Sequence, residues 1–377
     1  KNSFIFESVE KRRIRGRYTI IGGDPDKIWE FNANKINLIQ KNSKKIIKKK
    51  PYPFLKKLIE NFNFPLPKGL HKLSSLLVGY FSYDVIRYIE KIPDNCIDDL
   101  KIPDIRMLRP KTLIIHDNVL KKIFFIKNCF GDEKILNYKN YYLNQLAELD
   151  FLKNLSVTKK LNNIKKLKQK TKTKTIIKSN VSKKKFKEMI LKAKKYIKKG
   201  DIFQVVLSQR FECKTNKSPL EIYKKLRSSN PSPFMFYFNF EDFQIVGSSP
   251  EILVRLRKNK ITIRPIAGTR PRGLTATKDK FYKNQLLNDK KELAEHLMLL
   301  DLGRNDVGKI AKINTVKVTE KFKIEKYSHV MHIVSNVEGD FREKQTLLDA
   351  MFAGFPAGTV TGAPKIRAME IIDELEN

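Results

Sequence analysis

The chain has 377 residues, 41% of them hydrophobic, and a formal net charge of +37 at pH 7. This length allows a large buried core in one or two domains. No apolar run reaches the ~18 residues that a membrane-spanning helix needs, and no secretory signal is visible, so we expect no membrane partner. The three cysteines, Cys96, Cys129 and Cys213, are too few and too scattered for a disulfide framework, which favours the cytoplasm.

The positive charge is spread over the whole chain as lysine. Lysine far exceeds arginine, and isoleucine and asparagine are abundant, a composition typical of an AT-rich genome. Because no nucleic-acid-binding motif accompanies the lysines, we expect no nucleic-acid partner. A basic nucleic-acid-binding protein remains the alternative, and the charge can also attract a small dianionic substrate.

Residues 1–150 predict a β-rich α+β region. The predicted elements are strands at 4–8, 16–25 and 76–84, a basic connection at 41–50, a helix at 53–62, a helix at 85–90, and a hairpin of 112–117 with 122–126. A turn at the glycines and proline of 22–25 is expected to end the second strand. From about 152 to 180 the chain is rich in Lys, Asn and Thr, so 151–181 is expected to be a flexible linker.

Residues 182–377 form the second predicted region. Ser182 is a good N-cap for an amphipathic helix that Gly200 ends, and Ser218 caps another that begins at Pro219. The other predicted elements are strands at 203–211, 234–240, 244–256 and 260–266, a helix at 278–302, an extended run at 327–337, and a glycine-rich segment at 354–365 that opens a final helix.

An acidic pair lies on the helix predicted at 278–302. Glu292 and Glu295 are three residues apart, so their Cβ atoms share one helix face, roughly 5–6 Å apart. Two carboxylates at this spacing suit a hard divalent cation whose other oxygen ligands come partly from a substrate. A solvated acidic face is the alternative for an isolated pair.

Three further features carry possible chemistry. The segment 354–365 places backbone N–H groups at a helix start, which can bind an anion, although an ordinary turn is equally consistent with it. His329 and His332 have the spacing of a zinc pair, but a single catalytic or hydrogen-bonded histidine fits better, because no third ligand is apparent. Glu251 follows a bend, where a shielded carboxyl can act as a general acid and an unshielded one is a surface residue.

Together these motifs resemble the anthranilate synthase component I family of chorismate-utilising enzymes. The motifs that carry the resemblance are DIFQVVLSQR (201–210), NPSPFMF (230–236), GSSPE (247–251), RPIAGTRPRG (264–273), ELAEHLMLLDLGRND (292–306), HVMHIVS (329–335) and FPAGTVTGAPK (355–365). FES (6–8), GRY (16–18) and VGYFSYD (78–84) extend it into the first region. The resemblance covers almost the whole chain except the linker and the lysine-rich stretch near 41–50.

The resemblance implies a fold and a reaction. The fold is α+β, with large antiparallel β-sheets packed in a sandwich-like core and flanked by helices. The reaction converts chorismate and ammonia to anthranilate and pyruvate with Mg²⁺. The ammonia comes from a separate glutamine amidotransferase subunit, so the protein is expected to work as a hetero-oligomer.

The resemblance also assigns roles to individual residues. Glu292 and Glu295 match magnesium-associated glutamates, with Glu295 as the direct ligand. Glu251 matches the general acid that protonates the departing C4 hydroxyl, and Thr359 matches a hydrogen-bonding partner near that hydroxyl. His332 matches the active-site histidine, acting at the leaving hydroxyl or in pyruvate elimination.

Four positions concern the substrate and the nucleophile. Ala267, Gly268 and Thr269 match substrate contacts. Relatives that add water to chorismate carry Lys where this chain has Gln204, and aminodeoxychorismate synthases commonly carry Lys where it has Ala267. We therefore expect the ammonia-using anthranilate enzyme. An aminodeoxychorismate or isochorismate synthase, or an inactive remnant that keeps only partner binding, is the alternative.

The resemblance further implies feedback inhibition by tryptophan. The matching positions are Glu7, Ser8, Pro233, Phe234 and Met235, which join the two regions. Phe234 is commonly Tyr in relatives, and its ring packing does not need the hydroxyl, so we expect the site to be kept.

The family places a second pair of magnesium-associated glutamates, and an arginine for the substrate carboxylates, beyond the position of Asn377. We therefore expect this chain to be C-terminally incomplete. We also expect residues 1–377 alone to bind Mg²⁺ and chorismate poorly.

Overall fold

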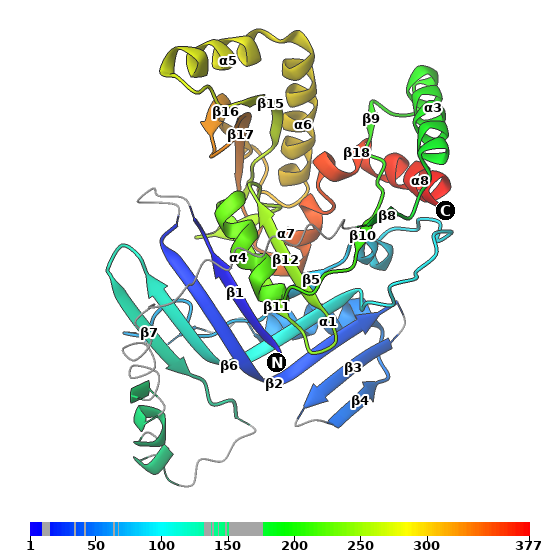
Figure 1. The fold of residues 1–377 in the computed structure, drawn as a ribbon. Coiled ribbons are helices and arrows are strands. Elements are labelled where there is room, and N and C mark those ends of the chain that lie inside the picture. Colours follow the sequence, from blue (N-terminus) through cyan, green and yellow to red (C-terminus); the bar gives the residue numbers. More distant parts are fainter. Residues whose placement is uncertain are drawn as a thin grey trace.

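The computed structural model describes residues 1–377 except 10–15, 34, 41–42, 63–64, 67, 132–136, 138, 142, 148 and 151–175. Its described part is built around two antiparallel sheets, one of nine strands and one of five, with helices between and around them (Figure 1). The predicted α+β class with large antiparallel sheets is confirmed. No helix in these ranges is long and apolar enough to span a bilayer.

The nine-stranded sheet contains strands from before and after the predicted linker. Its strands are β1 (Ser3–Glu7), β2 (Tyr18–Asn32), β3 (Lys35–Gln40), β4 (Ser43–Ile47), β5 (Val78–Phe81), β6 (Ile105–Asp117), β7 (Lys122–Lys127), β11 (Phe234–Asn239) and β12 (Gln244–Ser249). Their order is β12-β11-β1-β2-β3-β4, and β6 pairs with β2, β5 and β7. Because β11 pairs with β1, this sheet joins the sequence ranges 1–150 and 182–377.

Two predictions in this sheet are wrong. The chain does not turn at 22–25, because β2 continues to Asn32 and only shifts register against β6 between Pro25 and Lys27. Gly22 instead accommodates the Phe4 ring of its partner strand, and a Cβ there would lie 2.4 Å from that ring. The described part of the 41–50 connection contains β4, because residues 43–47 pair with β3.

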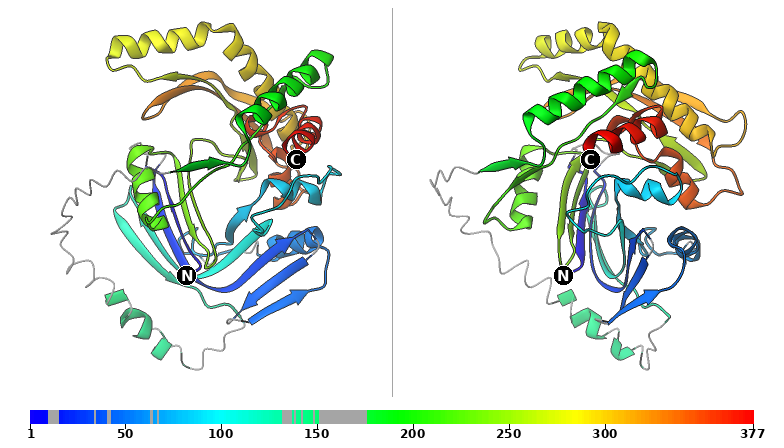
Figure 2. Two further views of the ribbon diagram at one scale, coloured as in Figure 1. Left: turned by 45° about the vertical axis from the view of Figure 1, so that its right-hand side comes forward. Right: turned by 90° about the vertical axis from the view of Figure 1, so that its right-hand side faces the viewer.

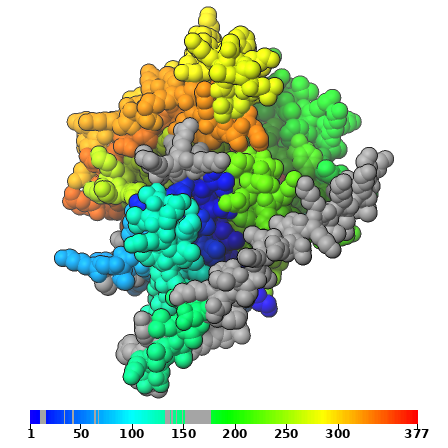
Figure 3. Space-filling model, turned by 60° about the vertical axis from the view of Figure 1, so that its left-hand side comes forward, coloured from blue at the N-terminus to red at the C-terminus, as the bar shows by residue number. Residues whose placement is uncertain are grey.

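The five-stranded sheet lies on the other side of the molecule. Its strands are β13 (Arg255–Arg257), β14 (Lys260–Ile263), β15 (Ile266–Pro271), β16 (Lys317–Lys326) and β17 (Val330–Asp340). Two helices, α5 (Ala276–Asn288) and α6 (Lys290–Gly308), replace the one helix predicted at 278–302. The break occurs because the Asp289 carboxylate accepts the N–H groups of Lys291 and Glu292 and so caps α6. In the space-filling view α5 (yellow) projects at the top of the molecule (Figure 3).

The remaining described elements are helices, 3₁₀ turns and short strand pairs outside the two large sheets. They are α1 (Pro51–Asn61), the 3₁₀ turns η1 (Tyr83–Tyr88) and η2 (Gly358–Val360), α3 (Lys183–Lys199), α4 (Pro219–Ser229), α7 (Leu347–Gly354), α8 (Lys365–Glu376), and the strand pairs β8 (Ile177–Ser179) with β10 (Phe211–Cys213) and β9 (Gln204–Val205) with β18 (Gly362–Ala363). The predicted caps Ser182, Gly200 and Ser218 are confirmed. Figure 2 shows α8 (red) beside α3 (green), where Ile371 and Leu375 pack against Met189 and Ala193.

Two further predictions differ from the structure. Most of the strand predicted at 203–211 is irregular, and only the short strands β9 and β10 form there. Most of the linker predicted at 151–181 lies outside the described residues, but its last part contains β8, which pairs with β10.

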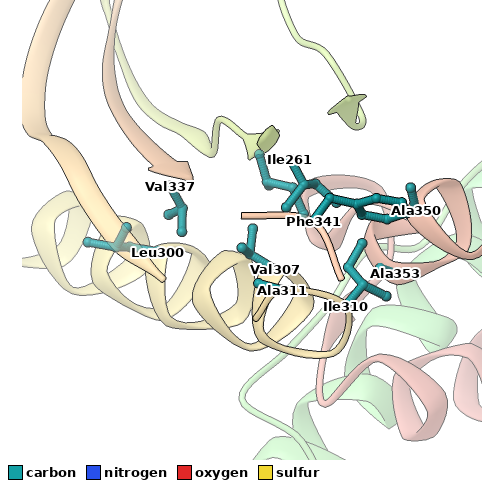
Figure 4. Close-up of a cluster of buried hydrophobic side chains, with 10 residues drawn as sticks. Ile261, Leu300, Val307, Ile310, Ala311, Val337, Phe341, Ala350 and Ala353 are labelled. Atoms are coloured by element: carbon teal, nitrogen blue, oxygen red, sulfur yellow. The ribbon is translucent and has the colours of Figure 1, made fainter. Parts of the chain in front are cut away.

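The core between the sheets fixes α6 in place. Val307 of α6 and Ile310, two residues after its end, pack with Ile261 of β14 and Val337 of β17 in one buried cluster, drawn in Figure 4. Helix α7 adds Ala350 and Ala353 to that cluster, while Leu348 and Phe352 on its other side enter the core of the large sheet. Because α7 is apolar on both sides, it joins the two sheets and holds α6 between them.

Candidate functional site

Glu251 lies just after β12, and its carboxyl group faces the segment that follows α7. Thr359 of that segment donates a hydrogen bond from Oγ1 to Glu251 Oε2, at 3.3 Å. The side chain is half-buried, and removal of its carboxyl from water raises the pKa of Glu251 to about 7, with the Thr359 bond acting in the opposite direction. The shielded carboxyl that the sequence analysis required is therefore present, and it suits proton transfer near neutral pH.

A cavity of about 30 Å³ lies beside this carboxyl. Its lining residues are Glu251, Ile252, Leu253, Ile263, Pro265, Leu299, Leu302, Gly303, Asp306, Gly354, Ala357, Gly358 and Thr359. The wall is mostly apolar, which accounts for the desolvation of Glu251. Asp306 is the other titratable residue of the lining, and it forms ion pairs with Lys365 at 2.6 Å and Lys309 at 3.1 Å.

His332 and its neighbours form the second part of the site. Strands β15 and β17 pair Thr269 with His332 and shift register at Gly268, whose φ of 74° suits glycine. His332 Nδ1 lies 3.0 Å from Thr269 Oγ1 and 3.2 Å from the Gly268 carbonyl oxygen. Since a carbonyl oxygen only accepts, Nδ1 carries the proton and Nε2 keeps a free lone pair. Burial lowers the pKa of His332, so the ring is a neutral base at neutral pH.

The acidic pair of α6 has specific partners. Glu292 Oε1 accepts a hydrogen bond from Arg270 at 3.2 Å, and Arg270 also contacts Asp289 at 2.6 Å. Glu295 Oε1 accepts a hydrogen bond from Gln204 Nε2 at 3.1 Å. Each glutamate thus has a polar partner of its own, which argues against a freely solvated acidic face.

Two links join the parts of the predicted site. A Cβ on Gly268 would lie 3.2 Å from Glu292 Oε2, so the histidine part adjoins the acidic pair. Gln204 of β9 is opposite Ala363 of β18. Strand β18 follows directly after the segment that carries Thr359. Ala267, predicted as a substrate contact, is half-buried on β15 opposite Ile333.

The geometry bears on two alternatives that the sequence left open, an anion site at 354–365 and a zinc pair at His329 and His332. Lys365 does not offer its charge to a bound anion, because its Nζ is buried against Asp306 Oδ2. His329 and His332 do not form a metal pair. His329 Nε2 lies 2.8 Å from the Ser229 carbonyl oxygen, away from the partners of His332. The described residues contain no cluster of three or more His, Cys, Asp or Glu residues able to hold a metal.

The sequence analysis missed the role of Arg270. This residue lies in the quoted motif at 264–273, but only the structure shows that its guanidinium holds both Glu292 and the helix cap Asp289. An arginine two residues after Gly268, in a motif preceding an acidic helix, was the available signal.

The five residues predicted to bind tryptophan also lie together. Glu7 pairs with Met235 across β1 and β11, next to Pro233 and the 43% exposed Phe234. Ser8 Oγ is buried and has no hydrogen-bonding partner in the described part of the chain.

Glu7 has two partners that the sequence analysis did not identify. Its Oε1 accepts hydrogen bonds from Tyr223 at 2.6 Å and Arg227 at 2.7 Å. These donors are four residues apart on α4, a spacing that places both on one helix face and could have indicated a shared partner.

Comparisons with known proteins agree with this architecture. A family model described as chorismate binding enzyme matches residues 1–377. The chain is 44% identical over 384 residues to anthranilate synthase component 1 of Cereibacter sphaeroides, covering 100% of this chain and 75% of that protein. The protein of the same name from Acetivibrio thermocellus is 41% identical over 377 residues, with 99% and 76% covered. The crystal structure of anthranilate synthase component I from Streptococcus pneumoniae superposes with a TM-score of 0.80 at 32% identity, covering 98% and 79%.

Replacing Thr359 with Val tests the coupling of Thr359 to Glu251. Valine keeps the shape of the side chain but removes the hydroxyl that stabilises the carboxylate, so Thr359→Val raises the pKa of Glu251 above about 7, by up to about one pH unit. Infrared difference titration of the protonated carboxyl band, with Glu251→Gln as baseline, measures the pKa of Glu251. Thr359→Ser keeps the hydroxyl and should titrate as the wild type. Identical titration of the Val variant would contradict the assignment.

Proposed function

The chain belongs to the chorismate-binding enzyme family and, within it, to anthranilate synthase component I, and we propose that it converts chorismate and ammonia to anthranilate and pyruvate. The ring of chorismate gains the ammonia nitrogen and loses its C4 hydroxyl as water, and loss of pyruvate then makes the ring aromatic. This chemistry needs a nucleophile site, a general acid at the hydroxyl and a base for the elimination.

The observation that carries the choice of nucleophile is the environment of Gln204. Its Nε2 donates to Glu295, while its Oε1 is buried and accepts no hydrogen bond among the described residues. Ammonia can donate an N–H to this oxygen and still attack with its lone pair. Water would need a base to deprotonate it, and an amide cannot serve as one. Gln204 therefore supports amination over hydration of chorismate.

Glu251 and His332 divide the proton transfers. Glu251, whose pKa is about 7, protonates the departing hydroxyl, and Thr359 holds the acid in position. His332 is neutral, and its free Nε2 accepts the ring proton during loss of pyruvate. An acid of this kind works in its protonated form, so the rate falls as the pH rises through the pKa of Glu251.

We propose Mg²⁺ as the cofactor, held by Glu295 with Glu292 beside it. The residues present fit this ion, because the two glutamates supply carboxylate oxygens, and hard cations take oxygen ligands. Bound Mg²⁺ would neutralise a substrate carboxylate. Arg270 already neutralises Glu292, which makes Glu295 the stronger candidate for a direct ligand.

The partner in this proposal is a glutamine amidotransferase subunit that releases ammonia, in a cytoplasmic hetero-oligomer. The designation component 1 of the relatives supports a second component. The unpaired thiols of Cys96, Cys129 and Cys213 suit a reducing compartment.

Tryptophan is the proposed feedback inhibitor. Among the described residues, both hydrogen bonds to Glu7 end on Oε1, so we assign Oε2 to a ligand ammonium, and Ser8 Oγ has no partner there. Phe234 and Met235 would contact the indole ring. Because β1 and β11 are more than 200 residues apart in the sequence, a ligand here would bridge two distant segments.

Anthranilate fluorescence tests the reaction. The intact gene product, given chorismate, Mg²⁺ and ammonium, should produce anthranilate, and glutamine without the partner subunit should not replace ammonium. Glu251→Gln keeps the shape of the side chain, but an amide is too weak an acid to protonate the departing hydroxyl, so kcat should fall about 10²- to 10⁴-fold. Folded wild-type protein that gives no fluorescence would refute the proposed function.

Titration calorimetry tests the metal site. Glu295→Gln removes one anionic oxygen ligand, and the intact gene product should bind Mg²⁺ at least about tenfold more weakly. Asp301→Asn is the matched control, since Asp301 is exposed on the same helix and pairs with Arg304. Equal Mg²⁺ affinity of the Glu295→Gln and wild-type proteins would exclude Glu295 as a ligand.

Calorimetry with tryptophan tests the inhibitor site. Ser8→Ala removes the oxygen that lacks a partner and should weaken tryptophan binding about 5- to 10-fold, the effect of one lost hydrogen bond. Ser228→Ala, on the exposed side of α4, should bind as the wild type. The proposal fails if tryptophan neither binds to nor inhibits the wild-type protein.

A further inference from the structure

One loop, residues 354–365, touches three separate parts of the proposed active site. Thr359 donates to Glu251 from its middle. Ala363 near its end pairs with Gln204 through β18 and β9. Thr361 Oγ1 accepts a hydrogen bond from Tyr83 at 3.2 Å, and Tyr83 belongs to the part of the chain before the linker. The position of this loop therefore sets the position of both the acid and the nucleophile residue.

Lys365 closes this loop. Its Nζ donates to Asp306 Oδ2 at 2.6 Å and to the Gly354 carbonyl oxygen at 3.1 Å. Lys365 is the last residue of the loop and Gly354 the first, so one side chain ties the two ends together and to α6. Lys365 and Asp306 are 9% and 4% exposed, so this pair is shielded from competing water.

Two glycines allow the loop backbone to pack closely against neighbouring segments. A Cβ on Gly354 would lie 2.5 Å from a methyl group of Val254, and one on Gly358 would lie 2.4 Å from a methyl group of Leu302. The backbone thus packs directly on the segment after Glu251 and on α6, which leaves a shifted loop few alternative positions.

We propose that Lys365 is a positioning residue, whose contacts with Asp306 and Gly354 hold the 354–365 loop closed so that Thr359 meets Glu251 and Ala363 meets Gln204. The proposal rests on the proposed function for the roles of Glu251 and Gln204. Lys365 does not touch the substrate in this account. Its effect passes through the loop backbone.

Opening the loop is expected to lower the pKa of Glu251. Loop residues Gly354, Ala357, Gly358 and Thr359 form one side of the cavity next to the carboxyl. Desolvation is the largest cause of the raised pKa of Glu251, ahead of the Thr359 bond. Water entering past a displaced loop therefore lowers this pKa, whereas loss of the Thr359 hydroxyl alone raises it. The two changes move the pKa in opposite directions.

The charge of Asp306 must be controlled in the test. It is the other titratable group of the cavity lining, and it would be left partly uncompensated if Lys365 alone were replaced. A carboxylate freed in this way would raise the pKa of Glu251 and obscure the effect of loop opening. The double variant Asp306→Asn with Lys365→Met removes both charges and the tie to Gly354.

Infrared titration of the intact gene product measures the outcome. In the double variant the pKa of Glu251 should fall from about 7 toward its ordinary 4.5, by about one pH unit or more. Lys309→Met is the matched control. Lys309 also pairs with Asp306, but its side chain is 59% exposed and, among the described residues, it makes no hydrogen bond to Gly354, so its loss should leave the pKa of Glu251 unchanged. A folded double variant that titrates as the wild type overturns the proposal.

Kinetics provide the second measurement. In the pH profile of kcat/KM, the fall at high pH should move to lower pH in the double variant by the same amount as the pKa of Glu251. If the fall stays in place while the variant is less stable, Lys365 contributes only to stability. If the double variant does not fold, Asp306→Asn with Lys365→Gln replaces it, because the shorter amide keeps a polar pair but does not reach Gly354. Absence of anthranilate from the wild type would refute the proposed function but leave the titration able to test the loop.

Discussion

A half-buried carboxyl group with no ion-pair partner among the described residues is the constraint on which the proposed site depends. Glu251 adjoins a mostly apolar cavity and receives a hydrogen bond from a hydroxyl group. A second carboxyl, that of Asp306, lines the same cavity and forms ion pairs with two lysines. Different surroundings thus give neighbouring carboxyl groups different functions, one as a proton donor and the other as an anchor. If Lys365 reached Glu251 instead, the cation would favour its ionised form and remove the acid.

Keeping this arrangement requires rigid neighbours. Helix α6 carries Asp306, Glu292 and Glu295, and its apolar residues are packed between the five-stranded sheet and α7 (Figure 4). The loop that carries Thr359 begins where α7 ends and finishes where α8 begins. The site is therefore supported by helices that belong to the cores of both sheets, and a change in the packing of either sheet can reach Thr359. The strand pairing of β1 with β11 at the proposed tryptophan site offers one such connection.

Local signals in the sequence predicted the features that local interactions determine. Helix α3 begins after Ser182 and ends at Gly200 as expected, because a hydroxyl cap and a left-handed glycine act within a few residues. The turn expected at 22–25 does not form, since pairing with β6, far away in sequence, keeps β2 extended. The position of Asp289 as a cap was also missed, although it divides α5 from α6.

In the proposed site, too, the sequence predicted the local features but not the contacts between distant segments. The spacing of Glu292 and Glu295 was visible in the sequence, but their partners Arg270 and Gln204 come from other strands. The segment 354–365 was a possible anion site because its backbone opens a helix, and only the fold shows that the charge of Lys365 is paired with Asp306. Residue types in a motif indicate possible chemistry, while the choice of partner depends on contacts between distant segments.

The most direct test of this account is the titration of Glu251 in the unmodified protein. Infrared difference spectra recorded across the pH range, with Glu251→Gln subtracted, report the protonated carboxyl band of this residue. Because desolvation raises the pKa of Glu251 to about 7, the band should disappear with a midpoint near pH 7. A midpoint near the ordinary glutamate value of 4.5 would show a solvated carboxyl and contradict the assignment of Glu251 as the general acid.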